Sequence, residues 1–145
     1  MTGIVVGVDG SVHSEHALSW AMKEAAVRHA ELTVLTVLPA VPSLATGNRE
    51  DYGEDPSGLD RARTSAKELV KKVASELGEQ RPGSVTVRVV NDSPAKALID
   101  ASQDADMLVV GSRGTGGFAR LMMGSVSTQV THHADCPVVV VPHDR

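Results

Sequence analysis

One stretch decides the fold: residues 107–127, which read MLVVGSRGTGGFARLMMGSVS. It opens on an apolar run, Met107 to Val110, of the kind that forms a buried strand. The stretch holds five glycines and two arginines, and its last residues, Gly124 to Ser127, predict a helix start with hydroxyls at the cap. A strand, a glycine-rich basic loop and a helix N-terminus together favour a phosphate site, because glycine lets the backbone approach closely and free amides face the oxygens.

The stretch differs from three other motifs that hold phosphates or nucleophiles. No lysine precedes Ser125, as a Walker A loop requires. Gly114–Thr115–Gly116 lacks a third glycine three residues on, so the dinucleotide fingerprint is incomplete. The segment 111–114 is not a nucleophile elbow. The same residues are also typical of an ordinary glycine-rich surface loop.

Composition excludes several function classes. A chain of 145 residues is expected to fold as one domain over 1–145, and a single Phe, Tyr and Trp leave the core to aliphatic side chains. The net charge of −4, without a basic run, argues against a nucleic-acid surface. No apolar run approaches about 18 residues and no leader pattern precedes the first strand, so we expect a cytoplasmic protein without membrane contact. The lone Cys136 fits a reducing compartment, excludes an internal disulfide and reads as a packing residue.

Apolar runs alternate with helical patterns along the whole chain. The pattern predicts strands at 3–8, 32–38, 85–90, 105–110 and 137–142, helices at 13–29, 59–77, 95–103 and 124–133, and a long polar loop at 40–58. Ser11 or Ser14 is expected to cap the first helix, Gly78 to end the second, and Ser93–Pro94 to start the third. Continuous aliphatic strands alternating with helices predict an α/β fold, a parallel sheet covered on both faces. Ligands bind such sheets at the carboxyl ends of the strands, so Asp9 should face the glycine loop.

The motif resembles one family across the whole chain. Gly111, two residues, Gly114, nine residues and then Gly124–Ser125 match the G-2x-G-9x-G-[S/T] signature of the ATP-binding branch of the universal stress protein family. The ending of the first strand and the final Cys136–Val141 run are similar to that family as well. The resemblance implies a three-layer sandwich of the adenine nucleotide α-hydrolase-like type, with five parallel strands in the order 3-2-1-4-5. It also implies a homodimer joined through the strand at 137–142, which would otherwise be a bare apolar edge.

The resemblance further implies the residues that bind a nucleotide. Asp9 would meet the ribose or a nucleotide-bound Mg²⁺ or Mn²⁺, and Val37 would present its backbone to adenine. Phosphates would be held by amides and hydroxyls, and the base pocket would be completed from the first strand; the full set is Val8, Asp9, Gly10, Val37, Gly111, Gly114, Gly124, Ser125, Val126 and Ser127. Arg113 is added from its place in the loop. Asp9 and Ser125 could equally act only as helix caps.

Four functions follow from these residues. The leading hypothesis is a stress-response or signalling protein that binds ATP. An AMP or cyclic AMP sensor would use the same adenine pocket with fewer phosphate contacts. Slow ATP hydrolysis or phosphoryl transfer is the enzymatic alternative, but Asp9 is the one candidate carboxylate and no lysine is dedicated to the phosphates. A dimeric scaffold without a ligand is the fourth, and the intact glycine signature argues against it.

Overall fold

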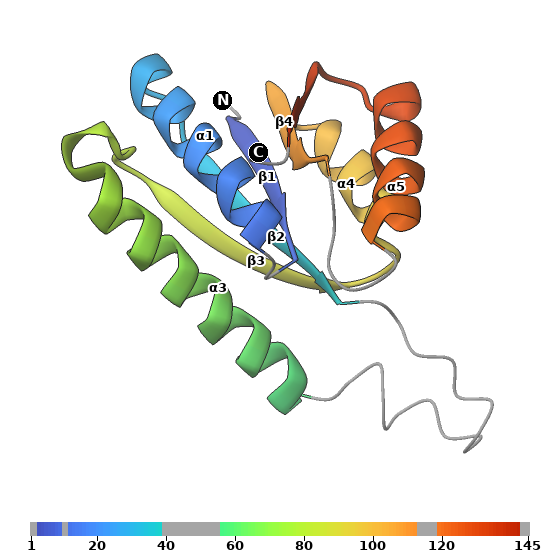
Figure 1. Ribbon diagram of the computed structural model, residues 1–145, viewed down its shortest axis with the longest axis horizontal. Helices are drawn as coiled ribbons and strands as arrows, with labels where there is room; N and C mark the ends of the chain where they lie inside the picture. Colours follow the sequence, from blue (N-terminus) through green and yellow to red (C-terminus); the bar gives the residue numbers. More distant parts are fainter. Residues whose placement is uncertain (1–2, 10–11, 39–55, 113–118, 143–145) are drawn as a thin grey trace.

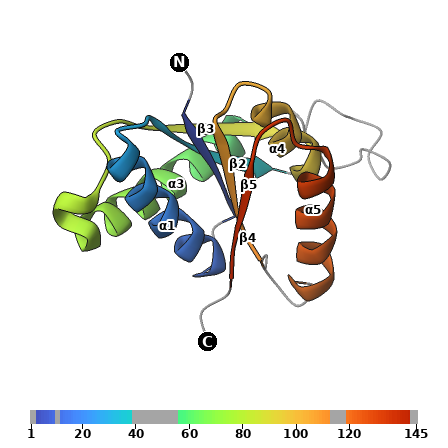
Figure 2. The same ribbon diagram turned by 90° about the horizontal axis from the view of Figure 1, so that it is seen from above.

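The chain folds into three layers, with a central sheet between two pairs of helices (Figures 1 and 2). The computed structural model describes residues 3–9, 12–38, 56–112 and 119–142. The sheet has five strands in the order β3-β2-β1-β4-β5, and every neighbouring pair is parallel. Its elements are β1 (Ile4–Val8), α1 (Val12–Arg28), β2 (Leu32–Leu38), α3 (Pro56–Leu77), η1 (Gly78–Gln80), β3 (Val85–Asn91), α4 (Pro94–Ser102), β4 (Met107–Gly111), α5 (Ala119–His133) and β5 (Val138–Val141). The predicted fold class and strand order are confirmed.

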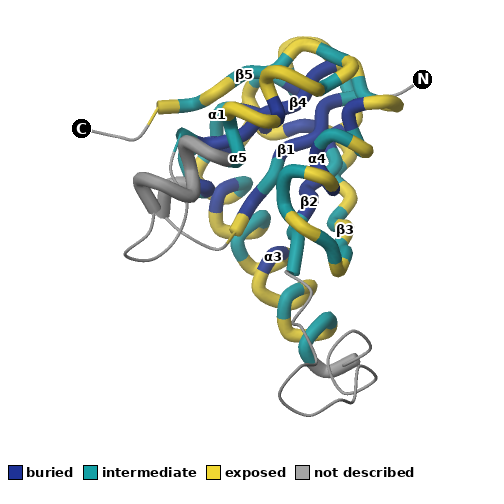
Figure 3. The backbone as a smooth tube through the Cα atoms, turned by 90° about the vertical axis from the view of Figure 1, so that its right-hand side faces the viewer, coloured by how far each residue is buried: buried dark blue, intermediate teal, exposed yellow. Residues whose placement is uncertain are grey.

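The central strands are the most deeply buried part of the molecule (Figure 3). All five residues of β4 are buried, and so are all residues of β1 except Gly7. Both strands are continuous runs of apolar residues and glycine, which is the pattern of parallel strands covered on two faces. The edge strand β3 differs, because Thr86 and Arg88 are exposed on its α4 side. The prediction that both faces are covered therefore holds for the middle of the sheet and is wrong for β3.

Each face of the sheet carries its own core. On one side α1 and α3 pack on the sheet, and Ala17, Ala21 and Ala25 of α1 are completely buried. Small side chains at these positions let the helix lie close to the strands, as its alanine-rich stripe predicted. On the other side α4 and α5 cover β1 and β4 through residues such as Leu98 and Val130. Figure 2 shows the two helix pairs on opposite sides of the strands.

Most predicted boundaries agree with the structure to within two residues, and the ends of α3 and β2 agree at Leu77 and Leu38. Gly78 follows α3 with a φ of 60°, a left-handed conformation that suits glycine and ends the helix. Ser93 and Pro94 start α4 as predicted, although the Ser93 hydroxyl makes no capping hydrogen bond. Ser14 is not a cap, because α1 already begins at Val12.

Two boundaries were predicted wrongly. The helix α3 begins at Pro56, three residues before its predicted start, so the end of the predicted 40–58 loop is helical. Residues 39–55 of that loop and the second candidate cap, Ser11, lie outside the described residues. The helix α5 begins at Ala119, five residues before the start predicted at Gly124.

Candidate functional site

The carboxyl ends of the strands bring several predicted site residues to one edge of the sheet. In β1 and β2, Val8 pairs with Thr36, so Asp9 lies level with Val37 one residue further along. In β1 and β4, Val6 pairs with Val109, and continuing this register by two residues places Val8 level with Gly111. Val8, Asp9, Val37 and Gly111 therefore share the edge at which ligands bind parallel sheets.

The residues at this edge differ in exposure. Gly111 and Val8 are buried, Val37 is half-buried against the core on the α4 and α5 side, and Asp9 is exposed. Past the end of β4, the Ser112 amide donates a hydrogen bond of 2.9 Å to the Val141 carbonyl, which ties the start of the glycine loop to β5. The edge thus presents an exposed carboxylate beside the point where the glycine loop leaves the sheet.

The phosphate-binding half of the predicted site is placed only in part. Gly10, Arg113 and Gly114 lie outside the described residues, as do the side chains of Gly124 and Ser125. Val126 and Ser127 are half-buried in α5. Val126 packs against the core between the sheet and α4, so its side chain has a structural role whatever its backbone does.

The start of α5 corrects the prediction for residues 124–127. The first four amides of a helix lack partners within it, and in α5 these belong to residues 119–122. Gly124, Ser125, Val126 and Ser127 lie beyond them, where each amide has a helical carbonyl four residues earlier. Gly124 is therefore not a helix N-terminus in this structure.

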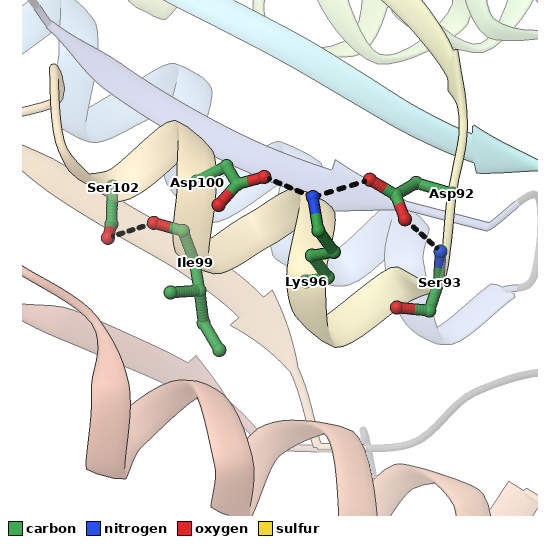
Figure 4. Close-up of polar contacts among 6 residues, drawn as sticks. All are labelled: Asp92, Ser93, Lys96, Ile99, Asp100 and Ser102. Carbon is green, nitrogen blue, oxygen red and sulfur yellow. Dashed lines mark hydrogen bonds and ion pairs between the residues drawn. The ribbon is translucent and has the colours of Figure 1, made fainter.

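Sequence reasoning missed a polar cluster at the end of β3. Figure 4 shows Asp92 and Asp100 on either side of Lys96 at the start of α4. The Lys96 ammonium lies 3.3 Å from the Asp92 carboxylate and 2.9 Å from that of Asp100. Hydrogen bonds to Asp100 and then Asp92 raise the pKa of Lys96 above its usual value. The spacing of four residues between an acid and a lysine was the signal in the sequence.

The same cluster closes the end of the sheet beside β2. The Asp92 amide donates a hydrogen bond of 3.0 Å to the Leu38 carbonyl, and the Asp92 carboxylate accepts one of 2.8 Å from the Ser93 amide. The turn between β3 and α4 is therefore held by one main-chain and two side-chain interactions, next to the strand that carries Val37.

A separate hollow of about 310 Å³ lies on the α4 side of β1, β2 and β3. Its floor includes Leu35 and Val90, and charged residues around it include Glu31, Arg88 and Asp104. None of the predicted site residues lines it. It is a different place from the edge where Asp9 and Gly111 meet.

The described residues limit the chemistry of the site. Across them, no three His, Cys, Asp or Glu side chains are grouped to hold a metal ion. A single carboxylate such as Asp9 suits a hard cation that a nucleotide already carries, because Mg²⁺ is usually held by one or two carboxylates and by substrate phosphates. None of the described helices combines the length and apolar character needed to cross a bilayer.

Comparison with known proteins agrees with this architecture. The family model described as the universal stress protein family matches residues 1–142. A universal stress protein of Mycolicibacterium smegmatis is 39% identical over 149 residues, which cover 98% of this chain and 48% of that protein. One of Mycobacterium tuberculosis is 37% identical over 144 residues, with the same two coverages. The chain thus spans about half the length of these curated relatives.

Solved structures share the fold as well. A universal stress protein crystallised in complex with cAMP is 25% identical, has a TM-score of 0.72, and is matched over 97% of this chain and 96% of its own. An Archaeoglobus fulgidus universal stress protein in complex with dAMP, 22% identical with a TM-score of 0.64, shares the fold over 97% of this chain and 98% of its own. The family model spans nearly the entire sequence, and the chain belongs to the universal stress protein family.

Proposed function

We propose that this chain binds an adenine nucleotide at the carboxyl edge of its sheet, with ATP as the ligand, and acts in stress response or signalling. The observation that carries the proposal is the meeting of Asp9, Val37 and Gly111 at one edge, beside the start of the glycine loop. The 25% identical relative in complex with cAMP supports an adenine nucleotide as the ligand class. AMP and cyclic AMP are the competing ligands.

In this proposal the nucleotide lies along the edge with its phosphates at the glycine loop. Gly111 and Gly114 give phosphate oxygens close access to backbone amides, and Arg113 adds positive charge. Asp9 faces the ribose or a Mg²⁺ or Mn²⁺ ion carried by the phosphates, and the Val37 backbone, with Val8 and Gly10, meets the base. The ion would supply charge neutralisation for the phosphates.

The position of α5 adds a requirement to the proposal. The hydroxyls of Ser125 and Ser127 can bind phosphate from a helix without any rearrangement. The amides of residues 124–127 can do so only if α5 begins nearer Gly124 in the complex than it does here. We therefore assign the hydroxyls and the amides of the glycine loop as the main phosphate ligands.

Two assays test the ligand. Protein purified without added nucleotide is denatured, and any released nucleotide is identified by chromatography; ATP is expected, and AMP or cAMP would identify the competing ligand. Calorimetric titration with Mg·ATP then compares the wild type with Gly114→Val, which crowds the loop and should weaken binding at least tenfold. Gly83→Val is the matched control, because nothing lies within 4 Å of an added Cβ there. Equal affinity of Gly114→Val and the wild type would contradict the proposal.

We also propose a homodimer that pairs through β5. This strand is at the edge of the sheet, bonds β4 on one side, and leaves Val140 39% exposed. An exposed apolar edge strand is a ready template for pairing with another chain. Light scattering should give a dimer for the wild type and a monomer for Val140→Lys, whereas Thr86→Lys on the opposite edge strand should stay dimeric. A monomeric wild type would contradict the proposal.

A further inference from the structure

The carboxyl ends of four neighbouring strands follow one another along the proposed site. Gly111 ends β4, Asp9 follows β1, Val37 lies near the end of β2, and Asp92 follows β3. Neighbouring strands are about 4.8 Å apart, so the line from β4 to β3 covers roughly 14 Å. If phosphates lie at β4 and the base at β2, as proposed above, the next group along the edge is the Asp92 turn.

The Asp92 turn is fixed in position. Its amide donates to the Leu38 carbonyl at 3.0 Å, directly beside the end of β2. Its carboxylate accepts from the Ser93 amide at 2.8 Å through Oδ1 and from Lys96 Nζ at 3.3 Å through Oδ2 (Figure 4). The side chain is only 32% exposed. A group held in this way can discriminate between ligands, because it cannot turn away from an unfavourable one.

The chemistry of the turn favours one kind of base. A carboxylate has about four acceptor positions and no donor, and two are occupied here. Adenine carries an exocyclic amine, which donates, whereas guanine and hypoxanthine carry an oxo group at the same ring position, which only accepts. Val37 and Val90 are half-buried against the α4-side core and offer an apolar surface for a ring nearby.

Resting on the proposed function, we infer that Asp92 is a specificity-determining residue that selects amine-bearing purines over oxo-purines. Its carboxylate accepts from the exocyclic amine of adenine at the outer end of the base subsite. An oxo group in that place would face an acceptor with no proton between them. Loss of a hydrogen bond to a charged group is the kind of difference that separates similar ligands by at least tenfold.

The experiment compares ATP with ITP, which differs at this one ring position, by calorimetric titration of the full chain. Wild-type protein is expected to bind ATP at least tenfold more tightly than ITP. Asp92→Asn keeps an oxygen for the Ser93 amide and offers an NH₂ donor, so the preference should fall to about threefold or less. Asp100→Asn is the matched control: it contacts the same Lys96 from the opposite side, two turns along α4 from Asp92, and should leave the ATP to ITP ratio unchanged.

The outcomes separate this inference from the proposed function. No ATP binding by the wild type contradicts both. Tight ATP binding with the same ATP to ITP ratio in the wild type and Asp92→Asn leaves the proposed function standing and overturns the role of Asp92. An equal change in Asp92→Asn and Asp100→Asn overturns it too, because the effect would then come from Lys96. If circular dichroism shows that Asp92→Asn is unfolded, Asp92→Ser, which keeps an acceptor for the Ser93 amide, replaces it.

Discussion

Replacing Ser102 by alanine should remove a connection between α4 and the segment that leads into β5. The Ser102 side chain is 1% exposed, and its hydroxyl donates to the Ile99 carbonyl at 2.6 Å. The same oxygen accepts from the Asp135 amide at 2.9 Å, across 33 residues of sequence. Alanine keeps the backbone but leaves the Asp135 amide without this acceptor.

The size of the effect follows from these two bonds. Each neutral hydrogen bond contributes about 1 kcal/mol net, and an unsatisfied donor costs about 1–3 kcal/mol. We therefore expect Ser102→Ala to lower the free energy of unfolding by about 2 kcal/mol. For a domain of this size that corresponds to a fall in Tm of roughly 4–8 °C.

Urea unfolding followed by circular dichroism measures this directly. The midpoint should fall while the slope m stays constant, since the surface exposed on unfolding hardly changes. The control is Ser75→Ala on the exposed side of α3, which should stay within about 0.5 kcal/mol of the wild type. A loss below about 0.5 kcal/mol for Ser102→Ala would refute the reasoning, because the Asp135 amide would then have an equally good partner.

Two further predictions concern other places in the chain. Gly3→Ala should destabilise by about 2 kcal/mol, because its Cβ would lie 2.3 Å from the Glu31 carbonyl oxygen, whereas Gly83→Ala, with no atom within 4 Å, should change the urea midpoint little. Burial, followed by two nearby carboxylates, raises the pKa of Cys136. Its alkylation should therefore need a higher pH in the folded than in the urea-unfolded chain, and the stability that depends on this thiol should be complete below the unfolded pKa and decrease as pH rises through the folded one. Equal pH midpoints in the two states would contradict this.

The elements of the fold follow from local sequence signals. Continuous apolar runs predicted all five strands, because parallel strands covered on both sides need no polar alternation. The resemblance supplied the strand order, which periodicity alone does not determine. The partial uncovering of β3 was less visible, although Thr86 and Arg88 alternate with valines on the side that α4 does not cover.

The wrong helix start at Gly124 has a physical reason. Glycine followed by serine is typical of a helix cap, and this local signal was given priority. The five preceding residues, Ala119 to Met123, are all strong helix formers, so the helix continues toward the N-terminus past Gly124. In α3 the overlooked signal was Pro56, because proline is favoured at the first helical position.

The candidate site could be predicted where it depends on strand ends. Asp9, Val37 and Gly111 share an edge because parallel strands in this order must end together. The turn at Asp92 was missed, since its role depends on a hydrogen bond to Leu38 that no local pattern announces. The partners of Ser102 were equally hidden, because they are joined only by tertiary structure.

The central claim is that a nucleotide binds at the carboxyl edge formed by β4, β1 and β2. Mapping the amide chemical shifts of the full chain during titration with Mg·ATP tests it most directly. The account predicts that the largest shifts fall at Asp9, Val37, Gly111 and Ser127, with none at the opposite edge around Gly3 and Glu31. Shifts confined to the hollow that Glu31 and Arg88 line, or no shifts at all, would contradict it.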